Sequence, residues 1–305
     1  MPEFPSFGQN HAVEAHGGNA AIRTVWERQN VWSQAARAQK ASVGQGRLIA
    51  LLLGIGAAVL GTLASQLMEV SSGAGRAAAF AAAVAGGAVP LAARRSSPQE
   101  AQEWTRLRSM AEALKSEVYA HLATVGRRDE AAGQALLERL AQLEESATGL
   151  AHHTAGIRPE ERPLPPVSDI ESYVVHRLRQ QIDGYYQPQA LRMRGHVRRI
   201  RRTETALALI GAALGGVAGA FGIEQAGVWI AVVTLVATSV TAHAAAARYA
   251  YQELEYFRTA SELETLLLRW ESAAQEGRAG DEFVQQCERI ISVQNDAWMV
   301  KWTTD

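Results

Sequence analysis

The side chains best suited to chemistry lie within one apolar segment. Residues 226–247 contain no Asp, Glu, Lys or Arg, so an imidazole and a row of hydroxyls there are costly unless they contact water or ions. We expect these groups to line a water-filled path: they are Thr234, Thr238, Ser239, Thr241 and His243. The alternative is that the hydroxyls bond to carbonyls of their own helix, and that His243 lies at the membrane interface near Arg248.

Other residues offer less chemistry. Two histidine pairs, His11 with His16 and His152 with His153, have no convincing third ligand nearby in the sequence, so we expect no metal site. Cys287 is the only cysteine, and its position on an amphipathic helix favours a core role over that of a nucleophile. The sequence shows no catalytic constellation, and we expect a protein that is not an enzyme and needs no cofactor.

The apolar segment is one of four that form two predicted hairpins. The first arms are residues 48–68 and 205–223, and the second arms are residues 77–93 and 226–247. Each arm lacks charged residues, and each approaches the roughly 20 apolar residues that cross a bilayer. The alanine-rich arm at 77–93 is also compatible with a tightly packed helix buried in a soluble bundle. We expect four membrane spans.

Small residues recur within these spans. Four-residue spacing of glycine allows two helix backbones to approach closely. In the second hairpin the residues are Gly211, Gly215 and Gly219, and a weaker series in the first hairpin includes Gly54 and Gly61. They either pack the two arms of one chain together or form a subunit interface around a pore.

Arginines gather at the polar ends of the predicted hairpins. Six of them precede the second hairpin: Arg192, Arg194, Arg198, Arg199, Arg201 and Arg202. The only basic residue in the loops between the arms is Arg76. The positive-inside rule therefore places both termini in the cytoplasm, at the cell inner (plasma) membrane. The six side chains should also attract anionic lipid headgroups, each by about 1 kcal/mol. Residues 1–18 lack the basic and apolar regions of a signal peptide.

The two halves of the chain resemble each other, because markers around the first hairpin recur about 150 residues later around the second. Helical periodicity in the flanking stretches predicts long helices and no strand. The expected fold class is an all-α membrane protein with two repeated units, each a transmembrane helical hairpin with cytoplasmic helices packed as a bundle. We expect a disordered tail at 1–19, a first unit at 20–147, a Pro-rich linker at 148–169 and a second unit at 170–305.

Each hairpin is preceded by aromatic, Gln and Ala residues and followed by aromatic, Arg and Glu residues. This pattern resembles that of the SLATT family, the SMODS- and SLOG-associating two-transmembrane effector domains. In the first half they are Trp26, Gln29, Trp32, Ala36, Trp104, Arg108 and Glu112. In the second half they are Tyr173, Gln181, Tyr185, Ala190, Tyr256, Arg258 and Glu262. The tandem arrangement departs from the simplest members of the family, which have one hairpin per chain.

The resemblance implies a membrane effector of a bacterial conflict system that acts in antiviral defence. Such a protein would form a homo-oligomer in the lipid bilayer and open a pore or perturb the membrane when a nucleotide-signal sensor partner, or a ligand of the cytoplasmic helices, triggers it. The net charge of −1 gives no indication of a nucleic acid partner. The alternatives are a membrane-anchored helical scaffold and a regulated small-ion channel without a toxic role.

Overall fold

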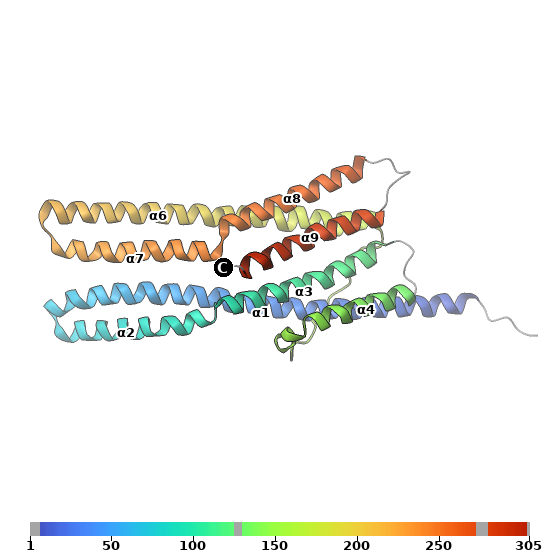
Figure 1. Cartoon of the computed structure of the whole chain (residues 1–305), viewed down its shortest axis with the longest axis horizontal. Coiled ribbons are helices and arrows are strands. Elements are labelled where there is room, and N and C mark those ends of the chain that lie inside the picture. Colours follow the sequence, from blue (N-terminus) through green and yellow to red (C-terminus); the bar gives the residue numbers. More distant parts are fainter. Residues whose placement is uncertain (1–6, 125–129, 273–279, 304–305) are drawn as a thin grey trace, which may run out of the picture. The chain divides into compact units, whose positions relative to one another are not determined.

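The computed structural model describes the backbone of residues 7–124, 130–272 and 280–303, and the side chains of residues 20–124, 130–223, 226–272 and 280–292. Every regular element in these ranges is a helix, as the sequence predicted (Figure 1). In chain order they are α1 (Phe7–Val70), α2 (Ser72–Arg94), α3 (Pro98–Ala123), α4 (Glu130–Ser146), η1 (Thr148–His153), α5 (Ile170–Tyr173), η2 (Val174–Arg179), η3 (Ile182–Tyr186), α6 (Gln187–Phe221), α7 (Glu224–Ala247), α8 (Tyr249–Ser272) and α9 (Gly280–Thr303).

The chain divides into two compact units, and each is formed from separate stretches of sequence. Unit 1 consists of residues 1–40, 101–188 and 256–305. Unit 2 consists of residues 41–100 and 189–255. The helices α1 and α8 therefore contribute several residues to each unit, and the first few residues of α3 and α6 also lie across the boundary.

Unit 1 is held together by an apolar helix core. On α3 the side chains of Leu107, Leu114 and Val118 recur at helical spacing and are fully buried, as an amphipathic helix requires. Leu178 and Leu263, from η2 and α8, are also fully buried. The start of α3 is fixed locally, because the Ser97 hydroxyl accepts a hydrogen bond from the Glu100 amide at 3.3 Å.

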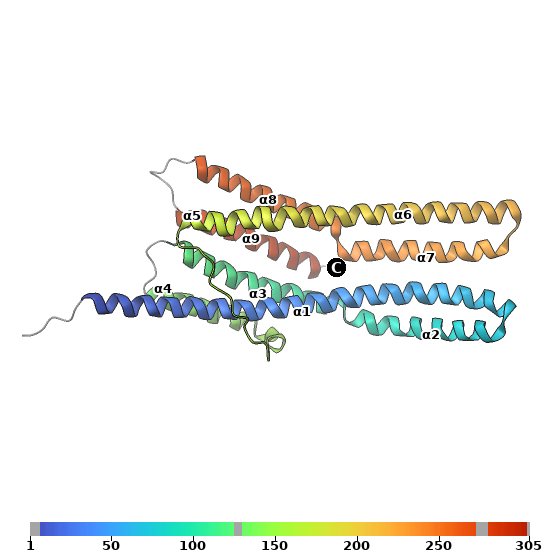
Figure 2. The ribbon, with the colours of Figure 1, turned by 180° about the vertical axis from the view of Figure 1, so that it is seen from behind.

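The Pro-rich segment between η1 and α5 follows the surface of α1 (Figure 2). The Trp26 indole donates a hydrogen bond to the Pro163 carbonyl at 3.0 Å. The Arg162 guanidinium donates to Gln29 Oε1 at 2.8 Å and lies 4.6 Å from the centroid of the Trp26 ring. These contacts attach the predicted linker to the helix along which it runs.

Unit 2 contains the two predicted hairpins, with α1 and α2 forming one and α6 and α7 the other (Figure 1). The four helices are long and apolar enough to cross a membrane, and only 6%, 0%, 0% and 11% of their most apolar windows is buried. A helix in the interior of a soluble bundle would be covered by its neighbours. The buried-helix alternative for residues 77–93 is therefore wrong, and this uncovered apolar surface fits a lipid environment.

The first hairpin turn is tighter than the sequence predicted, and the second lies earlier in the chain. Ser71 alone separates α1 from α2. A Cβ atom on Gly75 would lie 2.6 Å from Met68 Cγ, so the missing side chain permits this close turn. The second turn is centred on Gly222, before the predicted break at residues 224–225, because Gly222 adopts a left-handed φ of 64°.

The first helix also begins earlier than predicted. We expected a disordered tail over residues 1–19, whereas the backbone is helical from Phe7 onward. Both prolines of this region, Pro2 and Pro5, lie before the helix, and residues 7–70 contain none to interrupt it. The side chains of His11 and His16 lie outside the described residues.

Candidate functional site

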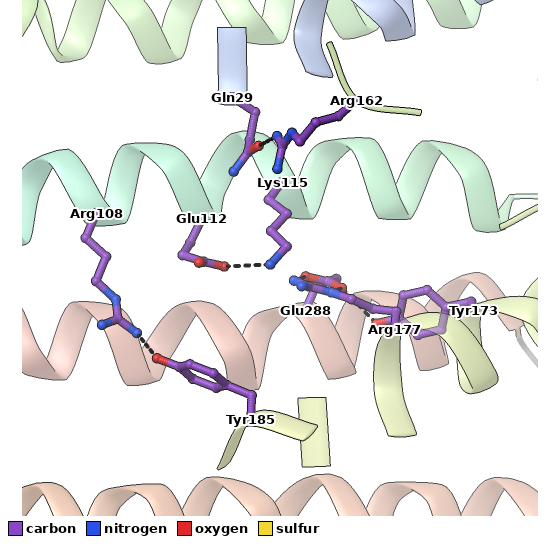
Figure 3. A network of polar contacts seen from close by, with 9 residues as sticks. All are labelled: Gln29, Arg108, Glu112, Lys115, Arg162, Tyr173, Arg177, Tyr185 and Glu288. Carbon is purple, nitrogen blue, oxygen red and sulfur yellow. Dashed lines mark hydrogen bonds and ion pairs between the residues drawn. The ribbon is translucent and has the colours of Figure 1, made fainter. Parts of the chain in front are cut away.

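A buried polar cluster in unit 1 centres on Arg177 of η2 (Figure 3). Its Nε and Nη2 atoms donate hydrogen bonds to the two carboxylate oxygens of Glu288, each at 2.8 Å. The Tyr173 hydroxyl donates to the same carboxylate at 2.9 Å. Tyr173 and Arg177 are four residues apart and so project from one helix face, where α9 presents Glu288. The arrangement ties η2 to α9 by a bidentate ion pair.

The surroundings of Arg177 favour its charged form. Burial by itself lowers the pKa of the guanidinium, but the carboxylates of Glu288 and Glu112 outweigh this effect and the pKa lies above its ordinary value. The Tyr119 ring centroid lies 4.5 Å from the guanidinium carbon, within cation–π range. Among the described residues, Nη1 of Arg177 has no hydrogen-bond partner. Arg177 is thus a permanent positive charge inside unit 1.

A second row of charges comes from one face of α3. The Arg108 Nη2 atom donates to the Tyr185 hydroxyl at 2.6 Å, and Lys115 Nζ lies 3.9 Å from Glu112 Oε2. Burial lowers the pKa of Lys115, and the nearby charge of Arg177 lowers it further against the opposing effect of Glu112. Burial would raise the pKa of Glu112, but Lys115, Arg177 and Arg108 together hold it below its ordinary value.

This second row borders a pocket of about 180 Å³ in unit 1. Its walls come from residues 33–40 of α1, residues 104–115 of α3 and residues 181–186 around η3. The charged side chains of the lining are Arg37, Lys40, Arg108, Glu112 and Lys115, and the aromatic ones are Trp104, Tyr185 and Tyr186. The pocket therefore combines a surplus of positive charge with flat apolar surfaces.

One wall of the pocket has unusual backbone geometry. Both η2 and η3 are π-helical, so their hydrogen bonds join residues five apart. This spacing changes the register of the side chains that follow relative to a continuous α-helix. Short π-helical turns occur frequently at functional sites. Here η3 presents Tyr185 and Tyr186 to the pocket, and Gln181, between the two turns, lines it as well.

The predicted pore-lining residues of α7 lie on two faces of the helix. At about 100° per residue, Thr234, Thr238 and Thr241 fall within one narrow stripe, and all three are exposed. Ser239 and His243 are half-buried and lie on the other side of the helix. The structure thus separates a threonine stripe, which we define as Thr234, Thr238 and Thr241, from the remaining two candidates.

The hydroxyls of the threonine stripe make hydrogen bonds of two kinds. Thr234 and Thr238 each donate at 2.9 Å to the carbonyl four residues earlier on α7. Thr241 instead donates to Glu204 Oε1 of α6 at 2.8 Å. The stripe therefore continues into a carboxylate at one end of the hairpin, a residue that the sequence analysis did not single out.

The predicted packing glycines also divide into two groups. A Cβ atom at Gly211 or Gly215 would lie 3.7 or 3.9 Å from a side chain of α7, and one at Gly61 would lie 4.0 Å from a side chain of α2. These three glycines face the other arm of their own hairpin. At Gly54 and Gly219 such a Cβ would meet nothing within 4 Å among the described residues, apart from its chain neighbours and the nearby backbone of its own helix.

The six arginines before the second hairpin are exposed along α6: Arg192, Arg194, Arg198, Arg199, Arg201 and Arg202. Arg194 Nε lies 3.7 Å from Glu253 Oε1 of α8. The ring of His196 stacks on Tyr249 with centroids 4.8 Å apart. These two contacts join α6 to the start of α8 inside unit 2 and leave the six guanidinium groups accessible.

The structure brings together one group of potential metal ligands that the sequence did not suggest. The ligand atoms of Glu103, His152 and His153 all lie within 4.8 Å of one another. The Glu103 carboxylate and His153 Nε2 are 2.9 Å apart and share a hydrogen bond. We found no third ligand in the sequence because Glu103 is distant from the histidines along the chain and only folding places it beside them.

Comparison with known families accounts for most of the elements described above. Residues 173–298 match the family model of the SMODS and SLOG-associating 2TM effector domain 1. The second half of the chain is a SLATT domain. Residues 30–130 match the family model named protein of unknown function (DUF4231). No curated protein and no solved structure matches the chain.

The SLATT domain begins at Tyr173 and contains the hairpin of α6 and α7 together with Arg177 and Glu288. The DUF4231 match contains the hairpin of α1 and α2 together with the charged row of α3. The pocket is therefore lined by side chains from both matched ranges. That the first half is a second SLATT copy remains a prediction from the repeated pattern.

Most aromatic residues of the family pattern lie in the core. Trp32, Tyr173 and Tyr256 are 3%, 0% and 4% exposed, so their principal contribution is packing. The arginines of the two halves differ: Arg108 faces the pocket, whereas Arg258 pairs with a glutamate of its own helix on the surface. The two halves of the chain are thus more alike in their buried aromatic residues than in their arginines.

Proposed function

We propose that this chain is a membrane effector of a bacterial conflict system that assembles into a homo-oligomer and opens a pore, or perturbs the bilayer, on a cytoplasmic signal. The match of residues 173–298 to a 2TM effector domain supports this role. The observation that carries the proposal is that no more than 11% of the most apolar window of any hairpin helix is buried within the described chain. Such surface is stable only against lipid or against other subunits.

The threonine stripe and Glu204 supply a candidate lining for the pore. They form one polar band along the second hairpin, because Thr241 bonds directly to Glu204. In an oligomer, equivalent bands from neighbouring subunits would surround a central column of water. Rings of carboxylates select for cations in channels, so we expect such a pore to prefer cations.

The charge distribution supports an orientation with unit 1 in the cytoplasm at the inner membrane. The six exposed arginines of α6 lie on the polar side of the second hairpin. Positively charged residues next to spans remain on the cytoplasmic side. Anionic lipid headgroups would add to this preference.

The proposal is tested by producing the chain in bacteria and following membrane potential with a voltage-sensitive dye. We expect overproduction to assemble enough pores that some open without the signal, so that the potential falls with the wild-type chain. It should fall much less with Thr238→Trp, which would fill the polar band. Leu209→Trp is the matched control, because Leu209 is 66% exposed and apolar on α6. An unchanged membrane potential with an inserted wild-type chain, or equal effects of the two tryptophans, would contradict the proposal.

A further inference from the structure

Cationic side chains outnumber carboxylates in the lining of the unit 1 pocket. Its lining contains the four cations Arg37, Lys40, Arg108 and Lys115 but a single carboxylate, that of Glu112. The side chains of Lys115 and Glu112 remain 24% and 28% exposed. Because they are partly shielded from bulk water but still reachable, an anion entering the pocket would meet these charges at reduced dielectric screening.

Two charge contacts of this lining are long. Lys115 Nζ lies 3.9 Å from Glu112, and Arg37 lies 3.8 Å from Glu160 of the linker. Charge-assisted hydrogen bonds are normally about 2.7–2.9 Å long. Lys40 Nζ lies over the Trp104 ring, 5.8 Å from its centroid. These cations therefore retain the capacity to form shorter and stronger bonds to an added anion.

The same pocket presents aromatic surfaces to a ligand. Trp104 and Tyr185 line it from two different elements, α3 and η3. Tyr185 is half-exposed, and its hydroxyl is fixed by Arg108 at 2.6 Å. Aromatic side chains that are held in place provide stacking surfaces at little entropic cost. The volume of about 180 Å³ is below the roughly 300–1,000 Å³ of pockets that enclose drug-sized ligands, so the ligand is small or partly exposed.

We propose that this pocket binds a small phosphate-bearing ligand with an aromatic ring, of the mononucleotide class. The phosphate would lie among Lys40, Arg108 and Lys115, and the ring would lie against Tyr185 or Trp104. Glu112 would disfavour a second anionic group on the α3 side. Ligands that contain only a phosphate or only a ring satisfy half of the lining and bind less tightly.

The inference deepens the proposed function, because it gives a place for the cytoplasmic signal. The ligand would contact α1, α3 and η3 together, and these elements come from both halves of the chain. Any effect of the ligand on a pore rests on the proposed function. Binding itself rests only on the pocket and is measured without a membrane current.

The test is isothermal titration calorimetry of the purified full-length chain in detergent with three probes: AMP, glycerol 3-phosphate and adenosine. AMP carries both the phosphate and the ring, and the other two carry one each. We expect AMP to bind, glycerol 3-phosphate to bind more weakly and adenosine not to bind measurably. Equal affinity for AMP and glycerol 3-phosphate would overturn the assignment of the ring, and no binding of either would overturn the whole proposal.

Substitutions of the lining residues test whether AMP binds in the pocket. Lys115→Met and the more exposed Lys40→Met should each weaken AMP binding about 10-fold or more, because each removes a charge-assisted bond. Glu112→Gln should strengthen it, since a carboxylate is lost. Arg106→Met is the control, a cation exposed on the same helix that does not line the pocket. Circular dichroism verifies that each variant is folded, and equal affinities in folded Lys40→Met, Arg106→Met and wild type would place the ligand elsewhere.

The proposal of a ligand pocket and the proposal of a pore can be contradicted independently. AMP binding without any change in liposome current would retain the pocket and contradict its coupling to the proposed function. Current that appears without AMP binding would retain the pore and contradict the pocket.

Discussion

The buried pair of Arg177 and Glu288 provides the first prediction at the residue scale. Glu288→Gln removes the carboxylate but leaves the guanidinium, whose side chain is fully buried. Losing one partner of a buried ion pair typically costs about 3–5 kcal/mol, because the remaining charge is uncompensated. We expect a correspondingly large destabilisation of unit 1 in thermal unfolding followed by tryptophan fluorescence.

The control for this variant is Glu271→Gln. Glu271 pairs with Arg179 at 3.0 Å, but both side chains are about half exposed, and surface pairs contribute about 0–1 kcal/mol. A Glu271→Gln chain should unfold almost as the wild type does. Equal effects of the two substitutions would show that burial of Arg177 does not govern the stability of this cluster.

A second prediction concerns pH and Glu112. Burial would raise the pKa of this carboxyl, but Lys115, Arg177 and Arg108 hold it below the ordinary value of 4.5. A group whose pKa is lower in the folded state stabilises the fold above its ordinary pKa, and this contribution is lost as the pH falls through the lowered value. The stability difference between wild type and Glu112→Gln should therefore be present at pH 6 and shrink below about pH 4.5. A stability difference between the two proteins that is constant from pH 6 to pH 3 would contradict this prediction.

The candidate pore-lining residues were easier to predict from the sequence than the residues of the pocket. The hydroxyls of Thr234 and Thr238 stand out because they interrupt a charge-free run. Arg177 and Lys115 lie among many other charged residues, and nothing local shows which of them become buried. The partner of Arg177, Glu288, lies far away along the chain, so only tertiary packing identifies this pair.

At the scale of elements, the segment between η1 and α5 should resist proteolysis because α1 holds it. Trp26→Phe removes the indole hydrogen bond to Pro163 but retains a ring beneath Arg162. A net loss of about 0.5–1.5 kcal/mol makes local opening about 2- to 10-fold more frequent. A glutamate-specific endoproteinase should then cleave after Glu160 or Glu161 at a correspondingly higher rate, measured by mass spectrometry.

Trp229→Phe is the matched control for this experiment. It makes the same chemical change in α7 of unit 2, whereas the segment belongs to unit 1. Cleavage after Glu160 at the same rate in wild type and Trp26→Phe would contradict a role for the indole bond. Faster cleavage in both variants would indicate a general loss of stability instead.

The helices themselves were largely predictable, because apolar runs and helical periodicity are local properties of the sequence. The turns were not: the position of the second depends on the left-handed backbone of Gly222, and this region contains several other glycines that could have served. The π-helical turns η2 and η3 have no sequence signature that separates them from an α-helix. Since these turns form one wall of the pocket, the pocket could not be predicted either.

At the scale of the whole molecule, the orientation in the membrane is open to a labelling test. Cys287 is buried, and burial together with Glu288 raises the pKa of its thiol to about 12, so it should react slowly with maleimides. A cysteine introduced by Ser71→Cys at the first turn would be the reactive thiol. We expect a membrane-impermeant maleimide to label it in intact spheroplasts.

The control places the introduced thiol in unit 1. Glu145→Cys lies on the exposed side of α4 and should be labelled only after lysis if unit 1 is cytoplasmic. The opposite pattern, with Glu145→Cys labelled in intact spheroplasts and Ser71→Cys protected, would reverse the orientation inferred from the arginines.

The most direct test of the central claim is single-channel recording across planar bilayers that contain the purified full-length chain, with and without AMP. We expect discrete current steps that favour cations, with less preference for cations in Glu204→Gln, because this substitution removes the carboxylate bonded to the threonine stripe. A chain that is inserted, as verified by maleimide labelling of Ser71→Cys, but carries no current under either condition would contradict the claim that these hairpins form a pore.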